Sequence, residues 1–515
     1  MNFLRRSPFL ALALVLAWRV LLLFFTAQPI PANDAFGYDG AVVNYLHGGA
    51  YCNPSFSVIF PISGREIYAT YPPLYQAAVF VWMKIFGTSV ISAMWLHLAL
   101  FLISGLITVA IVKRFFPSAV GTALAVLLLF GLTFDDRPEG LAYVFGLSAL
   151  SLVTQLISKP GVKWGISVLL AVSLLLTLYT SVIVGAYFFG VGFLTCIAAL
   201  IWRWNFYWFV PFLAAAVFFF VITFAIARWE PLWWAGFMES ARQQSVMTNG
   251  LHLPAAGDLL KLVRTAPVFI VALFVAPSVF MCRREVFSKD QPWLALLAGI
   301  AVMGWVLLIA SITFLAANYV NYTIFTQVIL ATGLLALAAE QFSARTCLLR
   351  TVLVACVCLV SIRAVGMTTW GVACASKNSY KSAEAVIKVE LEPYSNSIQP
   401  VLISSAFLYQ AADIGVKNPV HSDWYFDHSH WTNSVQINAL MQLQPTKLVL
   451  TQFDYYRSFA VLMRQLESQP DIVEVRIRNL AAIKPPDAIP SMQRVVQNIS
   501  WAPVIVDLNW KKPSL

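Results

Sequence analysis

Charged residues are scarce in this sequence of 515 residues. Asp, Glu, Lys and Arg together make up 11%, whereas hydrophobic residues make up 59%. A soluble protein of this length needs far more charge to cover its surface. The composition therefore excludes a soluble globular protein and predicts that lipid surrounds most of the chain.

Cysteine patterns typical of metal binding or of a disulfide framework are also missing. The seven cysteines are scattered, with no Cys-x-x-Cys pair and no Cys/His spacing that suits zinc. Only Cys52 and Cys374 are expected on the exterior side, so a disulfide between these two stays open. Repeats of fixed period are absent as well, which excludes a solenoid.

Apolar runs long enough to cross a bilayer recur along the first 370 residues. We predict about eleven transmembrane helices, at 8–26, 89–112, 118–134, 139–157, 164–181, 183–202, 207–228, 265–281, 292–313, 321–341 and 347–369. The first run resembles a signal peptide, but it has no convincing cleavage site and is expected to remain as a helix. Residues 71–87 are apolar but short and begin Tyr-Pro-Pro, which predicts an interfacial or partly inserted helix; a twelfth span there would reverse the topology downstream.

The net charge of +10 lies almost entirely in the membrane part, because residues 371–515 contain 13 basic and 12 acidic residues. Basic residues gather in the N-terminus and in alternate short loops, which is the positive-inside pattern. They are Arg5, Arg6, Lys113, Arg114, Lys159, Lys163, Arg203, Arg283, Arg284, Lys289, Arg345 and Arg350. The excess charge therefore predicts a cytoplasmic N-terminus and an exterior C-terminus, and no nucleic-acid partner.

Hydropathy falls after Trp370, so we divide the chain into a transmembrane domain, 1–370, and a soluble exterior α/β domain, 371–515. In the second domain we expect helices at 382–391 and 455–466 and strands at 401–404 and 447–451. The fold class is a polytopic α-helical membrane protein with a C-terminal α/β domain. The segment 421–430 holds three of the six histidines, and either metal binding or a polar aromatic loop would fit it.

The first exterior loop carries an acidic residue, Asp34, directly after the first predicted span. A carboxylate there would lie at the mouth of the helix bundle, where it can act as a general base between a lipid headgroup and an acceptor hydroxyl. Alternatively, Asn33 or Asp34 caps a surface helix that ends near Leu46. The apolar residues of that helix would then lie on the membrane; they are Phe36, Val42, Val43 and Leu46. The two roles of Asp34 are compatible.

The second exterior loop, 134–140, is wedged between two predicted spans and holds four charged residues, Asp135, Asp136, Arg137 and Glu139. They are expected near the headgroup plane, where charged groups often have a function. The alternative is an ordinary turn in which Asp135 or Asp136 caps the next helix and Pro138 lies in its first turn.

Four motifs of the first 160 residues resemble the exterior loops of the GT-C glycosyltransferases. They are Asp34-Ala-Phe-Gly-Tyr38, the helix end Leu46-His-Gly-Gly49, Tyr71-Pro-Pro-Leu74 and Arg137-Pro-Glu139-Gly140. The likeness is greatest to the RgtA/B/C/D-like enzymes, the lipid A aminoarabinose transferase and the protein O-mannosyltransferases; beyond these residues it is one of architecture. It implies inverting sugar transfer from a polyprenyl-phosphate donor to a cell-envelope glycan, lipid or protein, on the outer face of a bacterial inner membrane.

By this resemblance Asp34 is the catalytic base and Asp136 and Glu139 are supporting carboxylates. Many relatives have an Asp-Glu pair where this chain has Asp34-Ala35, so a second carboxylate must come from elsewhere, from Asp39 or Asp136. Tyr38, Asp39 and Tyr71 are candidates for substrate binding. No cofactor is required, although Mg or Mn would suit oxygen ligands of this kind.

A phosphate-linked donor needs cations, for which we select Arg137, Arg242 and Arg264, because arginine can bind phosphate through two hydrogen bonds. The alternative is that each side chain extends to lipid phosphates or solvent. Asn321 and Tyr322 begin the tenth span on the exterior side, where they can bind sugar hydroxyls or belong to the interfacial aromatic belt.

A transporter or flippase of lipid-linked substrates is the main alternative function. Transporters tend to place ionisable groups at the bilayer midplane and to show repeated halves. Here charge gathers at the exterior ends of the spans and the halves differ, so the sequence favours an enzyme. A membrane-anchored scaffold would not need acidic residues between spans.

Overall fold

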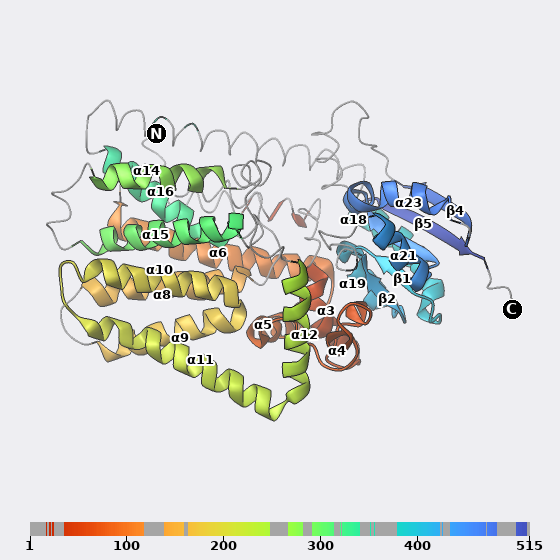
Figure 1. Ribbon diagram of the computed structural model, residues 1–515, viewed down its shortest axis with the longest axis horizontal. Coiled ribbons are helices and arrows are strands. Elements are labelled where there is room, and N and C mark those ends of the chain that lie inside the picture. The colour runs from red at the N-terminus through yellow and green to blue at the C-terminus, as the bar shows by residue number, and fades with distance from the viewer. Residues whose placement is uncertain are drawn as a thin grey trace.

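In a computed structural model of the chain, the structure describes residues 35–117, 139–158, 163–247, 266–281, 291–313, 322–339, 379–422, 433–469, 471–480 and 501–511, with a few single residues besides. A helical bundle and an α/β domain lie at opposite ends of the long axis (Figure 1). The predicted spans at 118–134 and 347–369, and most of 8–26, lie outside the described residues.

The bundle is built from long apolar helices that run along the long axis (Figure 1). They are α6 (Val90–Phe115), α8 (Glu139–Ser158), α9 (Trp164–Thr180), α10 (Val182–Ala199), α11 (Val210–Trp229), α14 (Pro267–Met281), α15 (Pro292–Thr313) and α16 (Ile324–Ala339). Within the described ranges, five helical stretches are long and apolar enough to cross a membrane. The chain is therefore a multi-pass membrane protein, while the total of about eleven spans stays a prediction.

Packing inside the bundle and exposure outside it both fit a lipid solvent. Helix α10 packs between α8 and α15, and Gly299 of α15 lets the two backbones approach, since a Cβ there would clash with Thr195 and with the carbonyl oxygen of Val191. Small residues at such crossings are typical of membrane helices. On the outer helix α11, Phe220 and Phe224 are 70% and 72% exposed, and lipid is the solvent that tolerates such a surface.

The C-terminal domain contains a five-stranded sheet in the order β2-β1-β3-β5-β4. The strands are β1 (Val401–Ile403), β2 (Pro419–His421), β3 (Lys447–Thr451), β4 (Ile472–Asn479) and β5 (Pro503–Trp510). Strands β1, β2 and β3 are parallel, whereas β5 is antiparallel to both β3 and β4. The predicted strands at 401–404 and 447–451 are confirmed as β1 and β3.

Helices accompany this sheet: α18 (Tyr380–Leu391), α19 (Ser405–Ile414), α21 (Asn433–Leu443) and α23 (Ala460–Leu466). Helix α18 confirms the predicted helix at 382–391. The predicted helix at 455–466 is present as a π-helical turn, η7 (Tyr455–Phe459), followed by α23. Helix α19 begins immediately after β1 and ends at Gly415, whose φ of 77° is the left-handed conformation common after a helix.

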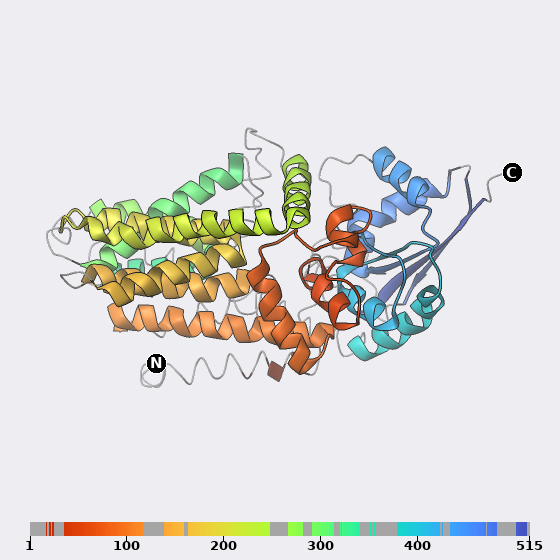
Figure 2. The ribbon, with the colours of Figure 1, turned by 90° about the horizontal axis from the view of Figure 1, so that it is seen from below.

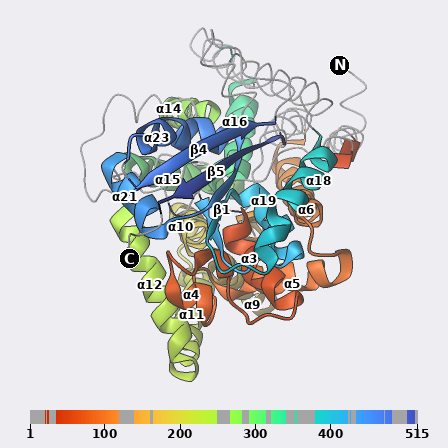
Figure 3. The same cartoon turned by 90° about the vertical axis from the view of Figure 1, so that its right-hand side faces the viewer.

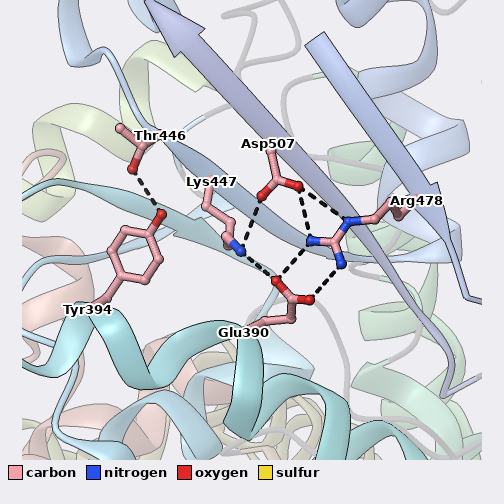
Figure 4. Close-up of polar contacts among 6 residues, drawn as sticks. All are labelled: Glu390, Tyr394, Thr446, Lys447, Arg478 and Asp507. Atoms are coloured by element: carbon pink, nitrogen blue, oxygen red, sulfur yellow. Dashed lines mark hydrogen bonds and ion pairs between the residues drawn. The ribbon is translucent and has the colours of Figure 1, made fainter. Parts of the chain in front are cut away.

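An ion-pair network fixes α18 to the sheet (Figure 4). Glu390 of α18 contacts Lys447 of β3 at 2.5 Å and Arg478 of β4 at 2.7 Å. Asp507 of β5 contacts the same two cations, at 3.1 and 3.0 Å. Hydrogen bonds from Arg478 and Lys447 lower the pKa of Glu390 to about 2, against its desolvation. The network holds three strands and one helix together as a unit.

A layer of short helices separates the bundle from the α/β domain (Figures 2 and 3). It consists of α3 (Ala35–Leu46), the 3-10 turn η1 (Pro54–Phe56), α4 (Pro61–Arg65) and α5 (Pro73–Phe86), with α12 (Pro231–Met247) standing across the bundle axis. Helix α5 confirms that residues 71–87 form a short helix. Its Pro73 occupies the first turn, where a missing amide hydrogen costs nothing.

Candidate active site

The helix that follows Asp34 in the sequence is buried inside the protein. Every residue of α3 from Ala35 to Val43 is buried, and Phe36, Val42 and Val43 belong to an apolar cluster that also contains residues of α5 and α19. The expectation that these side chains lie on the membrane was wrong, because α19 and α5 cover them. A buried α3 instead fixes the backbone beside Asp34.

Asp39 is the centre of a buried hydrogen-bonded chain. Its carboxylate accepts one bond from the hydroxyl of Tyr75, at 2.9 Å, and another from the hydroxyl of Tyr409, at 2.7 Å. The Tyr75 oxygen lies 3.2 Å from Nε2 of His97. All four side chains are at most 3% exposed. The hydrogen-bonded chain thus connects α19 of the α/β domain, α3, α5 and the apolar helix α6.

The surroundings of Asp39 disfavour its charged form. Burial raises the pKa of the Asp39 carboxyl to about 6, although the hydrogen bonds from Tyr409 and Tyr75 hold it lower than burial alone would. Neither partner is a cation. Asp39 therefore titrates in the range in which proton-transfer groups commonly work, and its two oxygens are already occupied by phenol hydroxyls.

Tyr38 and Tyr71 lie together, as their shared substrate-binding role would require. Their hydroxyl oxygens are 3.3 Å apart and their rings pack edge to face at 4.5 Å.

Asn53 donates to the carbonyl oxygen of Phe36, at 3.1 Å. A Cβ at position 40 would clash with the Asn53 side chain, so Gly40 is needed for this contact. The first-loop backbone is thus fixed from several sides.

Glu139 and Tyr322 occupy neighbouring helix ends close to this layer. Glu139 is the first residue of α8 and is 3% exposed, and Tyr322, also buried, precedes α16. Tyr143, one turn after Glu139, packs on Phe325 at 5.1 Å between ring centres. Phe325 in turn contacts Phe101, one turn after His97, at 5.5 Å. The supporting carboxylate and Tyr322 therefore lie at the same end of the bundle as the Asp39 chain.

Arg242 is placed by α12, which is tied to the first loop. Glu239 accepts a hydrogen bond from the amide of Ile62, at 3.2 Å, and Ser240 donates to the hydroxyl of Thr70, also at 3.2 Å. Arg242 follows these contacts by two residues and its side chain is exposed. An exposed cation beside the first loop is accessible to a phosphate, and its role stays a prediction.

The remaining candidates lie outside the described residues: Asp34, Asp136, Arg137, Arg264 and Asn321. Within the described part of the chain, no group of three or more His, Cys, Asp or Glu residues is arranged to hold a metal ion. The histidine-containing segment after His421 also falls largely outside. Cys52 is a free and buried thiol, and Cys374 also lies outside the described residues.

Sequence reasoning missed Tyr75, His97 and Tyr409. His97 had a detectable signal, because an ionisable residue inside an apolar span is a functional-site hypothesis in itself. Tyr409 had none: its partner Asp39 is 370 residues away in the sequence. No local pattern reports such a contact.

Comparisons with known proteins give structural matches only. No family model matches the chain, and no curated protein matches it. The structure is similar to the archaeal oligosaccharyltransferase AglB from Archaeoglobus fulgidus in complex with an inhibitory peptide and a dolichol-phosphate, with a TM-score of 0.49 and 10% identity over 90% of this chain and 71% of that one. It is also similar to ArnT from Cupriavidus metallidurans bound to undecaprenyl phosphate, with a TM-score of 0.48 and 14% identity over 96% of this chain and 97% of that one.

Both structural matches are distant. With TM-scores below 0.5 and identities far below 25%, they support no inference about substrate or chemistry. The function therefore has to be inferred from the residues of this chain.

Proposed function

We propose that the protein is a membrane glycosyltransferase that moves a sugar from a polyprenyl-phosphate donor to a cell-envelope acceptor, with inversion at the anomeric carbon. The observation that carries the proposal is the burial of α3 between the bundle and the exterior domain. Asp34 directly precedes Ala35 in the sequence, and in this proposal it acts at the junction where a lipid headgroup and a soluble acceptor can meet.

The proposed reaction needs one base and no redox chemistry. Asp34 takes the proton from the acceptor hydroxyl as its oxygen forms a bond to the anomeric carbon. The bond from that carbon to the phosphate oxygen breaks, and the polyprenyl phosphate leaves with the electron pair. Arg137, Arg242 and Arg264 stabilise the negative charge on the leaving phosphate. Each atom and charge is then accounted for.

The other candidate residues have supporting roles in this proposal. Asp136 and Glu139 orient the acceptor, while Tyr38, Tyr71, Asn321 and Tyr322 contact the substrates; Asp39, whose oxygens are bonded to Tyr75 and Tyr409, positions α3. A divalent cation, Mg or Mn, would be held by the loop carboxylates and would neutralise phosphate charge.

Charge along the spans supports an enzyme over a transporter. In the five described spans, Asp, Glu, Lys and Arg occur only near helix ends, as with Glu139 at the start of α8 and Lys113 and Arg114 in the last turn of α6. Transporters commonly carry such groups at the midplane. The basic end of α6 lies away from the α/β domain (Figure 1), which supports an exterior C-terminal domain under the positive-inside rule.

The test is transfer of radiolabelled sugar by purified protein in nanodiscs, with a panel of polyprenyl-phosphate sugars and envelope extract as acceptor. Asp34→Asn is expected to lower the rate by roughly 10²- to 10⁴-fold, the usual contribution of a general base. Asp471→Asn, the same change at an exposed position of the α/β domain, is the matched control and should leave the rate unchanged. No transfer with any donor would refute the function, and equal rates in wild type and Asp34→Asn would remove Asp34 as the base.

A further inference from the structure

The contact between α3 and α19 joins the two domains along its whole length. Its N-terminal end is the hydrogen bond from the amide of Phe36 to the hydroxyl of Ser405, at 3.0 Å. Its middle is the bond from Tyr409 to Asp39, and its C-terminal end is the pair His47 and Asp413, at 3.1 Å. The contacts follow the same order along both helices, so α19 holds α3 at three successive points.

The contact between α3 and α19, which we call the seam, is much more buried at one end than at the other. Asp39, Phe36 and Tyr409 are at most 3% exposed, and the Phe36 and Tyr409 rings pack edge to face at 4.9 Å. His47 and Asp413 have side chains that are 33% and 46% exposed. Buried hydrogen bonds to a charged group contribute more than exposed ion pairs. The strong part of the seam therefore lies at the N-terminal end of α3, next to position 34.

The bond between Phe36 and Ser405 has a further consequence. The first amides of a helix lack intrahelical partners, and the side chain just before the helix usually accepts from its second or third residue. Phe36 is the second residue of α3, and its amide is donated to Ser405 instead. An amide in the first turn of α3 is therefore satisfied by the α/β domain.

We propose that the C-terminal domain is a positioning element of the active site: Ser405 and Tyr409 clamp α3, because Ser405 accepts from the amide of Phe36 in the first turn and Tyr409 donates to Asp39. This inference rests on the proposed function. It makes Ser405, Tyr409 and Asp39 positioning residues, none of which touches the reacting atoms. The α/β domain then contributes to catalysis through α19.

The clamp, meaning the contacts that Ser405 and Tyr409 make with α3, should be visible in the pH dependence of the rate because of the groups around Asp39. Tyr75 of α5 and Tyr409 of α19 bond to its carboxylate, His97 of α6 lies beyond Tyr75, and Tyr68 is close enough for the Asp39 charge to raise the Tyr68 pKa. The bond from Tyr409 lowers the pKa of Asp39. Its removal must move the titration of Asp39 to higher pH, an effect that a general loss of stability would not produce.

The experiment compares Tyr409→Phe and Ser405→Ala with Tyr425→Phe, in full-length protein reconstituted in nanodiscs. Tyr425 is the matched control, because its buried hydroxyl donates to the carbonyl of Ala439 inside the α/β domain, at 2.9 Å. We expect kcat to fall roughly tenfold in Tyr409→Phe and Ser405→Ala, with KM for the donor within about twofold. The pH below which the rate falls should become higher in Tyr409→Phe only.

Hydrogen exchange of residues 35–47 gives a second readout that does not depend on turnover. Exchange should be faster in Tyr409→Phe and Ser405→Ala than in wild type and Tyr425→Phe, and Ser405→Thr, which keeps the hydroxyl, should restore protection. Unchanged exchange and unchanged kcat in both variants of an active enzyme would overturn the clamp. A wild-type protein inactive with every donor would instead refute the enzyme function, and faster exchange would still support the clamp.

Discussion

Glu390 and Asp39 are both carboxylates at a junction between elements, but their surroundings shift their pKa values in opposite directions. Glu390 faces two cations, and its pKa falls to about 2. Asp39 faces two phenols in a fully buried site, and its pKa rises to about 6. The first arrangement keeps a charge in place at any ordinary pH. The second keeps a carboxylate near its titration point, which is typical of functional sites.

The Glu390 network and the Asp39 chain therefore have different roles. The Glu390 network holds one domain together internally, across α18, β3, β4 and β5. The Asp39 chain instead joins two domains beside the candidate base. Substitutions at Glu390 should therefore affect stability and leave the chemistry alone, whereas substitutions at Asp39 should lower the transfer rate.

Within this comparison, the largest expected effect is that of Asp39→Asn on the transfer rate. The amide cannot accept two hydroxyl bonds as a charged carboxylate does, so the clamp on α3 weakens; we expect kcat to fall roughly 30-fold. Steady-state transfer assays on Asp39→Asn and Glu390→Gln would check this. A larger loss of activity per folded molecule in Glu390→Gln than in Asp39→Asn would contradict the different roles of the two carboxylates.

Next in size is the response to pH. Asp39 with a pKa of about 6 loses its charge as pH falls through 6, so the rate should drop roughly tenfold between pH 7 and pH 5. Stability should change the other way: between 3.8 and about 6 the folded state binds the extra proton, so unfolding becomes harder as pH falls through this window. Parallel rate and thermal-unfolding measurements test both signs, and a rate that is flat from pH 5 to 7 would contradict the role of Asp39.

Glu390 should contribute nothing to the changes in rate and stability between pH 7 and pH 5. Its folded pKa of about 2 lies below the ordinary 4.5, so the stability that it provides is complete above 4.5 and is lost only as pH falls toward 2. Glu390→Ala removes one of the two carboxylates and leaves Asp507 to pair with both Lys447 and Arg478, which we expect to cost about 2 kcal/mol, since the pairs are partly solvated. Thermal unfolding at pH 7 should show a lower Tm with unchanged transfer by the folded fraction. An unaltered Tm would mean that the network is not stabilising.

The smallest expected effect is that of Asp413→Asn at the exposed end of the seam. Its pair with His47 is screened by solvent, so the rate should change by less than about twofold. Thr88, which also bonds Asp413, offers Thr88→Val as a companion variant. A tenfold loss in either would show that the clamp does not depend on its buried end.

Much of this fold follows from the sequence, because lipid imposes a simple rule. A span must satisfy its backbone internally and expose apolar side chains, so runs such as 139–157 and 292–313 predict α8 and α15 almost to the residue. In the soluble domain β4 was missed, although its alternation of Val473, Val475 and Ile477 with charged residues is typical of an edge strand. Strand β2 has only three residues, too few to show a period.

The candidate site was predictable only in part. Tyr38 and Tyr71 were selected from two motifs that are 33 residues apart, and they do lie together, because both belong to the segment between the first two predicted spans. The partner of Asp39 was not predictable, since Tyr409 reaches it through the tertiary docking of α19 on α3. The burial that raises the Asp39 pKa has the same origin and leaves no trace in the neighbouring sequence.

The most direct test of the central claim separates transfer from transport. Purified protein in sealed vesicles would be given a radiolabelled polyprenyl-phosphate sugar and an acceptor on one side, with label in product and label across the bilayer counted together. The account predicts label in a glycosylated acceptor, with inverted anomeric configuration by NMR, and no protein-dependent translocation of the lipid. Translocation of the lipid without any transfer would contradict it and establish a transporter.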